Sequence, residues 1–175
     1  PAWDSTLQFG SPLVFDSEGR LCVTTGERSV RAARGLAQDL TTHLGKVLYL
    51  DPQSGAGVNP PIAANALAEI WSYGHRNIQA AALDQTGQLW TVEHGPRGRD
   101  ELNQPQRGLN YGWPIISYGT EYTGFDVGKG LTAHEGMEQP VYYWDPVIAP
   151  SGMSFYDHDL FTGWRHSLVI GALGG

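Results

Sequence analysis

Leu13-Val-Phe-Asp-Ser-Glu-Gly-Arg-Leu-Cys-Val23 is followed, 68 residues later, by the similar stretch Ala81-Ala-Leu-Asp-Gln-Thr-Gly-Gln-Leu-Trp-Thr91. Each stretch predicts a strand, an Asp-x-x-Gly turn and a second strand, because glycine accepts a positive φ and an aspartate side chain bonds its own backbone. A looser third copy runs from Gly152–Tyr156 to Ser167–Gly171, with a longer insertion around Trp164. Repeated hairpins of this kind predict the four-stranded antiparallel blades of a β-propeller.

The composition also favours short strands in one globular domain. The chain has 175 residues, of which 41% are hydrophobic and 11% aromatic, and it contains 23 Gly and 11 Pro. The length predicts a single domain over residues 1–175, and turn-forming and aromatic residues in such numbers are typical of all-β proteins. We expect a further strand within His43–Pro52, a short helical turn within Arg28–Thr42 and long loops at Gln53–Asn65 and Thr120–Glu138.

Charge and missing motifs exclude several classes of function. The net charge is −7 and there is no basic stripe, so nucleic acid is not an expected partner. Cys22 is the only cysteine, which leaves no internal disulfide and no cysteine-based metal site. No apolar run is long enough to span a membrane, and no signal peptide is present. Neither Gly-x-Ser-x-Gly nor a P-loop occurs, so hydrolase and P-loop functions have no support.

The ends of the sequence suggest a piece of a longer protein. The chain begins at Pro1, without a Met, and ends at Gly175, directly after the apolar run Leu168–Leu173. A domain seldom stops at the end of a buried strand. We therefore expect further residues on both sides of this chain in the natural protein.

The loop Tyr73-Gly-His-Arg-Asn77 lies between two strand-like runs. Polar loops at strand ends are where β scaffolds place ligand sites. Arg76 offers a planar fork of donors that suits carboxylates, and Asn77 offers both a donor and an acceptor. The alternative is that Arg76 packs against Trp71 and ties a turn.

A second polar loop, Glu93-His-Gly-Pro96, is rich in groups that can coordinate a cation. Gly95 can bring its backbone close to a ligand, and hard cations such as Ca²⁺ take oxygen ligands that include backbone carbonyls. Asp100 and Glu101 follow at once, and the chain returns through Tyr111. These residues indicate an oxygen-rich cation site, and the alternative is a solvated acidic turn.

Two aromatic or basic features are weaker signals of function. The run Tyr142-Tyr-Trp144 is predicted to pack between blades, and the alternative is a wall of a substrate or quinone pocket. His94 has no nucleophile or partner nearby in sequence, so we predict no catalytic role for it.

Six strings occur in this order: Leu44-Gly-Lys-Val47, Glu69-Ile-Trp-Ser-Tyr-Gly-His-Arg-Asn-Ile-Gln79, Glu93-His-Gly-Pro-Arg-Gly-Arg-Asp-Glu-Leu-Asn103, Gly108-Leu-Asn-Tyr-Gly-Trp-Pro114, Gly136-Met-Glu-Gln-Pro-Val141 and Ala149-Pro-Ser-Gly-Met153. Together they resemble the soluble aldose sugar dehydrogenases of the glucose/sorbosone dehydrogenase family, which use pyrroloquinoline quinone (PQQ). The resemblance implies a six-bladed β-propeller, of which this chain is about half, with PQQ and Ca²⁺ in the central cavity. It also implies oxidation of an aldose to a lactone, in a periplasmic or secreted protein.

The resemblance implies particular residues for each ligand. Contacts to PQQ would come from Arg76, Asn77, Tyr122, Ala172 and Leu173. The carbonyls of Gly95 and Pro96 would bind the Ca²⁺ that polarises the quinone, and Glu101 and Tyr111 would bind a second, structural Ca²⁺.

The chain departs from the family pattern at several places. The catalytic His of the family lies in blades before Pro1, so no catalytic residue is predicted within this chain. Gly174 stands where the family places a cationic residue against PQQ. Ile78 and Ala80 replace a Pro and a Gly of the family pattern.

These departures leave two functions open. The first is an enzyme fragment that carries part of the PQQ and Ca²⁺ sites and is inactive alone. The second is a non-enzymatic binding module built from propeller blades. In either case an unclosed ring exposes strand edges and blade faces, so we expect self-association or pairing with the missing blades.

Overall fold

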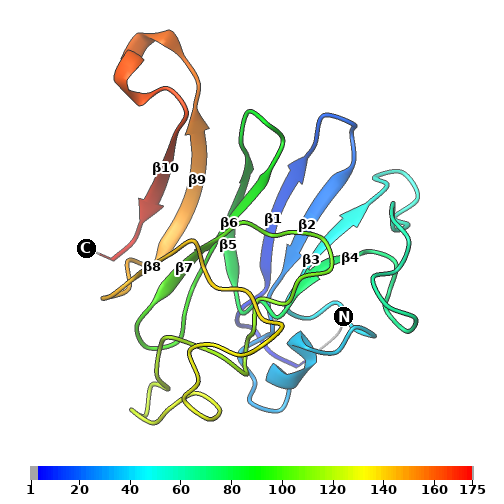
Figure 1. Cartoon of the computed structure of the whole chain (residues 1–175), viewed down its shortest axis with the longest axis vertical. Helices are drawn as coiled ribbons and strands as arrows, with labels where there is room; N and C mark the ends of the chain where they lie inside the picture. The colour runs from blue at the N-terminus through cyan, green and yellow to red at the C-terminus, as the bar shows by residue number, and fades with distance from the viewer. Residues whose placement is uncertain (1–3, 175) are drawn as a thin grey trace.

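The computed structural model describes residues 4–174. Within them, ten strands form three antiparallel sheets (Figure 1). The first sheet contains β1 (Gly10–Phe15), β2 (Leu21–Thr25), β3 (Lys46–Leu50) and β4 (Ile70–Tyr73) in that order. The second contains β5 (Ile78–Leu83), β6 (Leu89–Glu93), β7 (Asp100–Asn103) and β8 (Tyr142–Trp144). The third pairs β9 (Pro150–Tyr156) with β10 (Ser167–Ala172).

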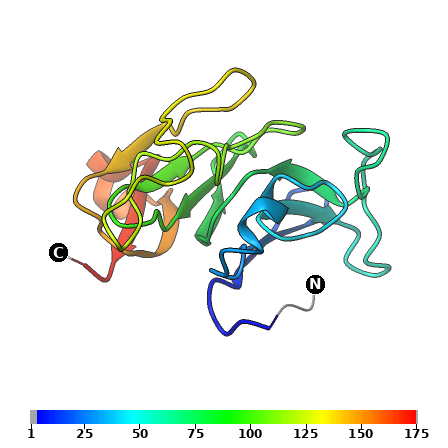
Figure 2. The ribbon, with the colours of Figure 1, turned by 90° about the horizontal axis from the view of Figure 1, so that it is seen from below.

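The sheets follow one another as propeller blades do. β5, the first strand of the second sheet, packs against both β1 and β9, which are the first strands of the neighbouring sheets. Figure 2 shows the two four-stranded sheets side by side, with the hairpin of β9 and β10 beyond the second. This arrangement confirms the predicted all-β fold of consecutive four-stranded antiparallel blades, of which the chain covers part of a ring.

The two Asp-x-x-Gly turns occupy equivalent places, as predicted. Asp16 begins the turn between β1 and β2, and the Gly19 nitrogen donates to its carbonyl at 3.0 Å. Asp84 begins the turn between β5 and β6, and the Gly87 nitrogen donates to its carbonyl at 2.9 Å. Both glycines have a positive φ, of 77° and 82°, which explains why glycine stands there.

The other predicted elements are also found. The strand expected within His43–Pro52 is β3, and the helical turn expected within Arg28–Thr42 is the 3-10 helix η1 (Arg34–Ala37). The third hairpin is formed by β9 and β10, and its insertion contains a second 3-10 helix, η2 (Asp159–Trp164). Neither helix in residues 4–174 has the length and apolarity that a bilayer crossing requires.

The core between the first two sheets is apolar and closely packed. Cys22, Val47, Tyr49, Ile78 and Leu89 form one buried cluster, which joins both sheets. Burial of this surface supplies the main favourable free energy of folding. The cluster holds the two sheets in a fixed relation, and thereby fixes the loops at their ends.

Lys46 is an unusual member of the interior. Its side chain is fully buried, and its Nζ donates to the carbonyls of Leu36 at 2.9 Å, Ala37 at 3.0 Å and Leu44 at 2.6 Å. Burial lowers the pKa of Lys46 to about 7. These bonds anchor η1 to the start of β3.

The prediction that Tyr142, Tyr143 and Trp144 pack between blades is wrong for the described residues. Tyr142 is 56% exposed, and Tyr143 stacks on Tyr118 with ring centroids 4.5 Å apart. The reason is positional, because β8 is the outermost strand of its sheet, whereas β9 packs against the innermost one. As to the alternative, a wall of a substrate or quinone pocket, none of the three lines the larger pocket described below, but Tyr142 and Tyr143 line a separate open pocket of about 460 Å³.

Candidate functional site

Both polar loops lie at the same end of the sheets, opposite the two Asp-x-x-Gly turns (Figure 1). There they border an open pocket of about 700 Å³, within the usual size of small-molecule sites. Five predicted residues line it: Arg76, Asn77, Gly95, Pro96 and Tyr122. The structure therefore brings together residues that are up to 46 positions apart in the sequence.

Glu93, at the end of β6, organises the loop that carries Arg76 and Asn77. Its carboxylate accepts from the backbone nitrogens of Arg76 at 2.7 Å and Asn77 at 3.3 Å, from His75 Nδ1 at 3.1 Å and from Asn103 Nδ2 at 3.1 Å. Burial opposes the charged form, but the bonds from His75, Arg76 and Asn77 outweigh it and lower the pKa of Glu93. Glu93 was not predicted as a site residue, since the only signal that marks it in the sequence is a carboxylate at the end of a strand-like run.

His75 completes this buried network. Its Nε2 lies 2.9 Å from Ser72 Oγ, and its ring stacks on Tyr111 with centroids 4.8 Å apart. Ser72 and His75 have no exposed surface, so a substrate cannot reach this Ser-His-Glu arrangement. We interpret it as a support for the loop and not as a nucleophilic triad.

Arg76 is buried at the wall of the pocket. Its Nη1 donates to the carbonyls of His94 at 2.8 Å and Gly95 at 2.7 Å, and its guanidinium lies 5.2 Å from the Trp113 ring centroid. The alternative expected from sequence, packing on Trp71, is not found; that ring packs on Tyr49. The Arg76 Nε is buried and has no hydrogen-bond partner in residues 4–174. Arg76 lines the pocket, and a guanidinium at such a wall suits an anionic ligand group.

Asn77 and Gln79 form a second polar group on the wall. The Asn77 Oδ1 accepts from Gln79 Nε2 at 2.9 Å, and both side chains line the pocket. Gln79 was not predicted as a site residue, although it ends the string Glu69–Gln79. Its spacing from Asn77, which directly precedes β5, was the signal that could have identified it, because residues two apart in extended backbone share a face.

Gly95 has no room for a side chain. A Cβ at this position would lie 2.0 Å from the Arg99 carbonyl oxygen, which explains the glycine between His94 and Pro96. The Gly95 nitrogen donates to Asp100 Oδ1 at 3.0 Å, and the Gly95 carbonyl is held separately, by Arg76 Nη1. That carbonyl already accepts from Arg76, and its second lone pair is what a cation would use.

Asp100 does not serve the cation site that the sequence suggested. Its Oδ1 accepts from the Gly95 nitrogen, and its Oδ2 accepts from the backbone nitrogens of Ile148 at 2.9 Å and Ala149 at 2.8 Å. The side chain is 2% exposed. Asp100 instead ties the loop of Gly95 to the start of β9.

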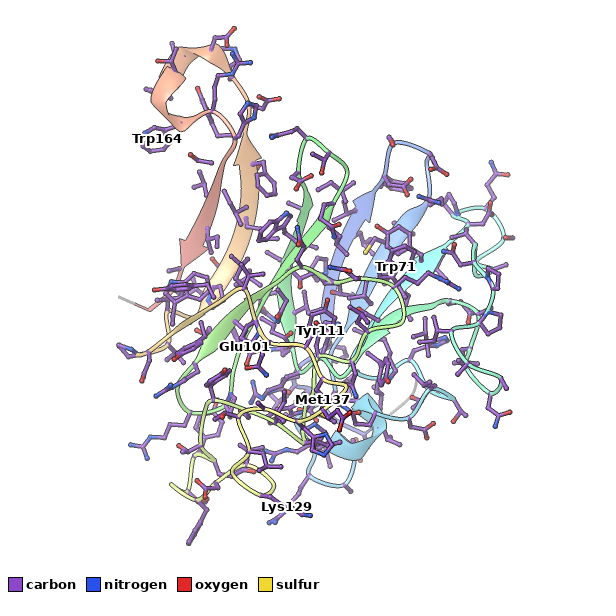
Figure 3. All side chains as sticks on the ribbon, in the orientation of Figure 1. Trp71, Glu101, Tyr111, Lys129, Met137 and Trp164 are labelled. Carbon is purple, nitrogen blue, oxygen red and sulfur yellow. The ribbon has the colours of Figure 1, made fainter. Side chains whose placement is uncertain are left out.

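A second, small cavity lies beneath this loop. Its volume is about 20 Å³, enough for roughly one water molecule or ion. Four predicted residues line it: Gly95, Pro96, Glu101 and Tyr111. Figure 3 labels Glu101 on β7 and Tyr111 in the loop that follows.

Glu101 lies at this cavity in surroundings that disfavour its ionised form. Burial, followed by the nearby carboxylate of Glu93, raises the pKa of Glu101 to about 8, and its one side-chain donor among the described residues, Asn103 Nδ2, is 3.5 Å away. The Tyr111 hydroxyl donates to the Gln104 carbonyl at 2.7 Å, so a ligand role for Tyr111 falls to its backbone carbonyl. Residues 4–174 hold no cluster of three or more His, Cys, Asp or Glu side chains suited to a metal.

Ala172 and Leu173 do not line the larger pocket in the described residues. Ala172 pairs with Pro150, and the Leu173 nitrogen donates to the carbonyl of Ala149 at 3.0 Å. Ala149 does line the pocket, so both residues pair with the segment at its edge, while Leu173 itself is 79% exposed. His94 joins the same wall, because its Nε2 lies 2.8 Å from the Pro150 carbonyl oxygen.

Comparisons with known proteins agree on one family. The family model described as Glucose / Sorbosone dehydrogenase matches residues 1–175. The aldose sugar dehydrogenase YliI of Escherichia coli (strain K12) is 46% identical over 178 residues, which cover 99% of this chain and 47% of that protein. The chain spans about half the length of the curated relatives it matches.

Solved structures show the same similarity. The apo form of the soluble aldose sugar dehydrogenase from Escherichia coli superposes with a TM-score of 0.89 at 44% identity, over 97% of this chain and 49% of that one. The PQQ-bound aldose sugar dehydrogenase from Streptomyces coelicolor superposes with a TM-score of 0.74 at 29% identity, over 97% of this chain and 43% of that one.

Proposed function

Because the chain belongs to the glucose/sorbosone dehydrogenase family, we propose that it forms part of the PQQ and Ca²⁺ site of an aldose sugar dehydrogenase. The observation that carries this proposal is the pocket of about 700 Å³, on which five residues predicted from separate loops converge. The whole enzyme would oxidise an aldose to a lactone, with the quinone accepting the electrons. By the same resemblance we place the protein in the periplasm or outside the cell.

The residues of the pocket fit an anionic quinone. PQQ carries carboxylates, and the guanidinium of Arg76, which is buried at the pocket wall, is a suitable partner for a carboxylate. Asn77 and Gln79 add amide donors, and Tyr122 adds a ring that is 69% exposed. These side chains would bind and orient the cofactor, while Glu93 holds the backbone of the Arg76 loop in place.

The residues of the small cavity fit a hard cation. Glu101 supplies a carboxylate whose burial disfavours a free charge, and Tyr111 supplies a carbonyl beside it. Gly95 and Pro96 border both the cavity and the pocket. We propose that Glu101 and Tyr111 hold a structural Ca²⁺, and that the carbonyls of Gly95 and Pro96 hold a Ca²⁺ that needs the negative charge of PQQ beside it.

The chain alone is expected to show no aldose oxidation with PQQ, Ca²⁺ and an artificial electron acceptor. The base that removes the sugar proton is expected outside this sequence, and general-base assistance contributes about 10²–10⁴-fold to such reactions. A dye-reduction assay with glucose and other aldoses measures this directly. Turnover that persists after removal of any contaminating longer enzyme would overturn the placement of the base.

The chain in isolation is also expected to self-associate. Large apolar side chains are exposed on β1, on β10 and directly after β10: Leu13 at 63%, Phe15 at 61%, Val169 at 45% and Leu173 at 79%. Faces of this kind are covered by neighbouring blades in a propeller, and exposed apolar patches mark interfaces. Light scattering at increasing concentration tests this, and a monodisperse monomer throughout would contradict it.

A further inference from the structure

Arg34 and Glu121 form an ion pair between two loops that are 87 positions apart. Arg34 lies in η1, and Glu121 lies in the long loop between β7 and β8. The ion pair is bidentate: Arg34 Nη1 donates to Glu121 Oε1, and Arg34 Nη2 donates to Glu121 Oε2 at 3.1 Å. Both side chains are mostly buried, with exposed fractions of 18% and 23%, so the pair is shielded from solvent.

The pair is joined to the pocket through Trp113. The Arg34 guanidinium lies 5.3 Å from the Trp113 ring centroid, and the Arg76 guanidinium lies 5.2 Å from the same centroid. Trp113 is 4% exposed. One indole therefore contacts both the cation of the ion pair and the cation of the pocket, an arrangement stabilised by cation–π attraction.

The pair is also joined to the pocket through the chain, since Tyr122 follows Glu121 directly. Glu121 closes a tight turn, in which its nitrogen donates to the Phe125 carbonyl at 2.7 Å and its carbonyl accepts from the Gly124 nitrogen at 2.8 Å. Thr120 exchanges two backbone bonds with Arg97, at 2.9 and 3.0 Å. Among the described residues, two side-chain ties join this turn to loops of the first sheet: the Arg34–Glu121 ion pair, and a hydrogen bond between Tyr122 and the Arg76 side chain.

We propose that Arg34 is a positioning residue, whose ion pair with Glu121 holds Tyr122 at the mouth of the pocket and whose guanidinium supports Trp113 behind Arg76. The expected effect on cofactor binding rests on the proposed function. Its structural part, an ordered turn at Glu121–Phe125, can be measured without any cofactor.

The test compares Arg34→Gln, Glu121→Gln and the double variant. Each is expected to speed hydrogen exchange at the amides of Glu121 and Gly124 by about fivefold or more, because each removes the same tie. The double variant should exchange about as fast as Arg34→Gln alone. Arg165→Gln is the matched control, because it removes the exposed ion pair of Arg165 and Asp159. It should leave the exchange rates of these amides unchanged.

A second readout is PQQ affinity measured in Ca²⁺. Both single variants should weaken it by about fivefold or more if the wild type binds. If the wild type fails to bind PQQ, the proposed function is wrong. The exchange result still shows whether the Arg34–Glu121 ion pair orders the turn. Unchanged exchange in both single variants, or effects that add fully in the double variant, would refute the role of Arg34.

Discussion

Replacing Glu93 by alanine is expected to lower the free energy of unfolding by roughly 3–5 kcal/mol. Four donors point at this carboxylate: the nitrogens of Arg76 and Asn77, the His75 ring and the Asn103 amide. Removing the acceptor leaves these groups buried without partners, and each such group costs about 1–3 kcal/mol. Urea unfolding followed by circular dichroism measures the loss.

The same carboxylate gives the stability a defined dependence on pH. The pKa of Glu93 is lowered in the folded state, so its contribution is present above the ordinary glutamate value of about 4.3 and is lost as the pH falls through the folded value. Glu93→Gln, which keeps the volume, should remove this part of the acid sensitivity. Glu135→Ala is the control on an exposed loop and should change stability by less than about 0.5 kcal/mol. An equal effect at both positions would contradict the role of Glu93.

Glu101→Gln is expected to change the stability of the chain in opposite directions with and without Ca²⁺. Without Ca²⁺, burial raises the pKa of Glu101 to about 8, so this group's contribution to stability falls as the pH rises from about 4.5 through 8. The glutamine variant avoids that loss and should be at least as stable as the wild type at pH 8.5. With Ca²⁺ at about 100 times its Kd, the wild type should gain about 2.7 kcal/mol, or roughly 5–10 °C in Tm, and the variant should gain almost nothing.

Differential scanning calorimetry in EDTA and in Ca²⁺ separates these outcomes. Glu135→Gln serves as the matched control, because it removes one exposed charge from a residue that does not line the cavity. A wild-type Tm that ignores millimolar Ca²⁺, or a Glu101→Gln variant that responds as the wild type does, would show that the small cavity is not a Ca²⁺ site.

The fold was predictable because its signals are local. A turn such as Asp84–Gly87 closes within a few residues, and the strands beside it alternate in polarity, so sequence alone fixes each hairpin. The pocket residues were predictable for a different reason: Arg76 and Gly95 belong to strings that resemble one family. Both kinds of signal are carried by contiguous residues.

The parts that sequence did not reveal depend on distant partners. Nothing near Asp100 in sequence shows that Ile148 and Ala149 will occupy its Oδ2, which removes it from any cation site. The pairing of Arg34 with Glu121 spans 87 positions, and no local pattern marks it. Tyr142 was misplaced because an aromatic run indicates burial without saying which strand of a blade is outermost.

Equilibrium titration of PQQ into the purified chain, in the presence of Ca²⁺ and followed by quinone absorbance, tests the central claim most directly. The account predicts a saturable spectral change that is lost in EDTA and weakened about tenfold or more in Arg76→Lys, which keeps the charge but not the planar fork. Circular dichroism of that variant establishes that it is folded. No spectral change with the folded wild type, or equal binding by folded Arg76→Lys, would contradict the assignment of this pocket to the cofactor.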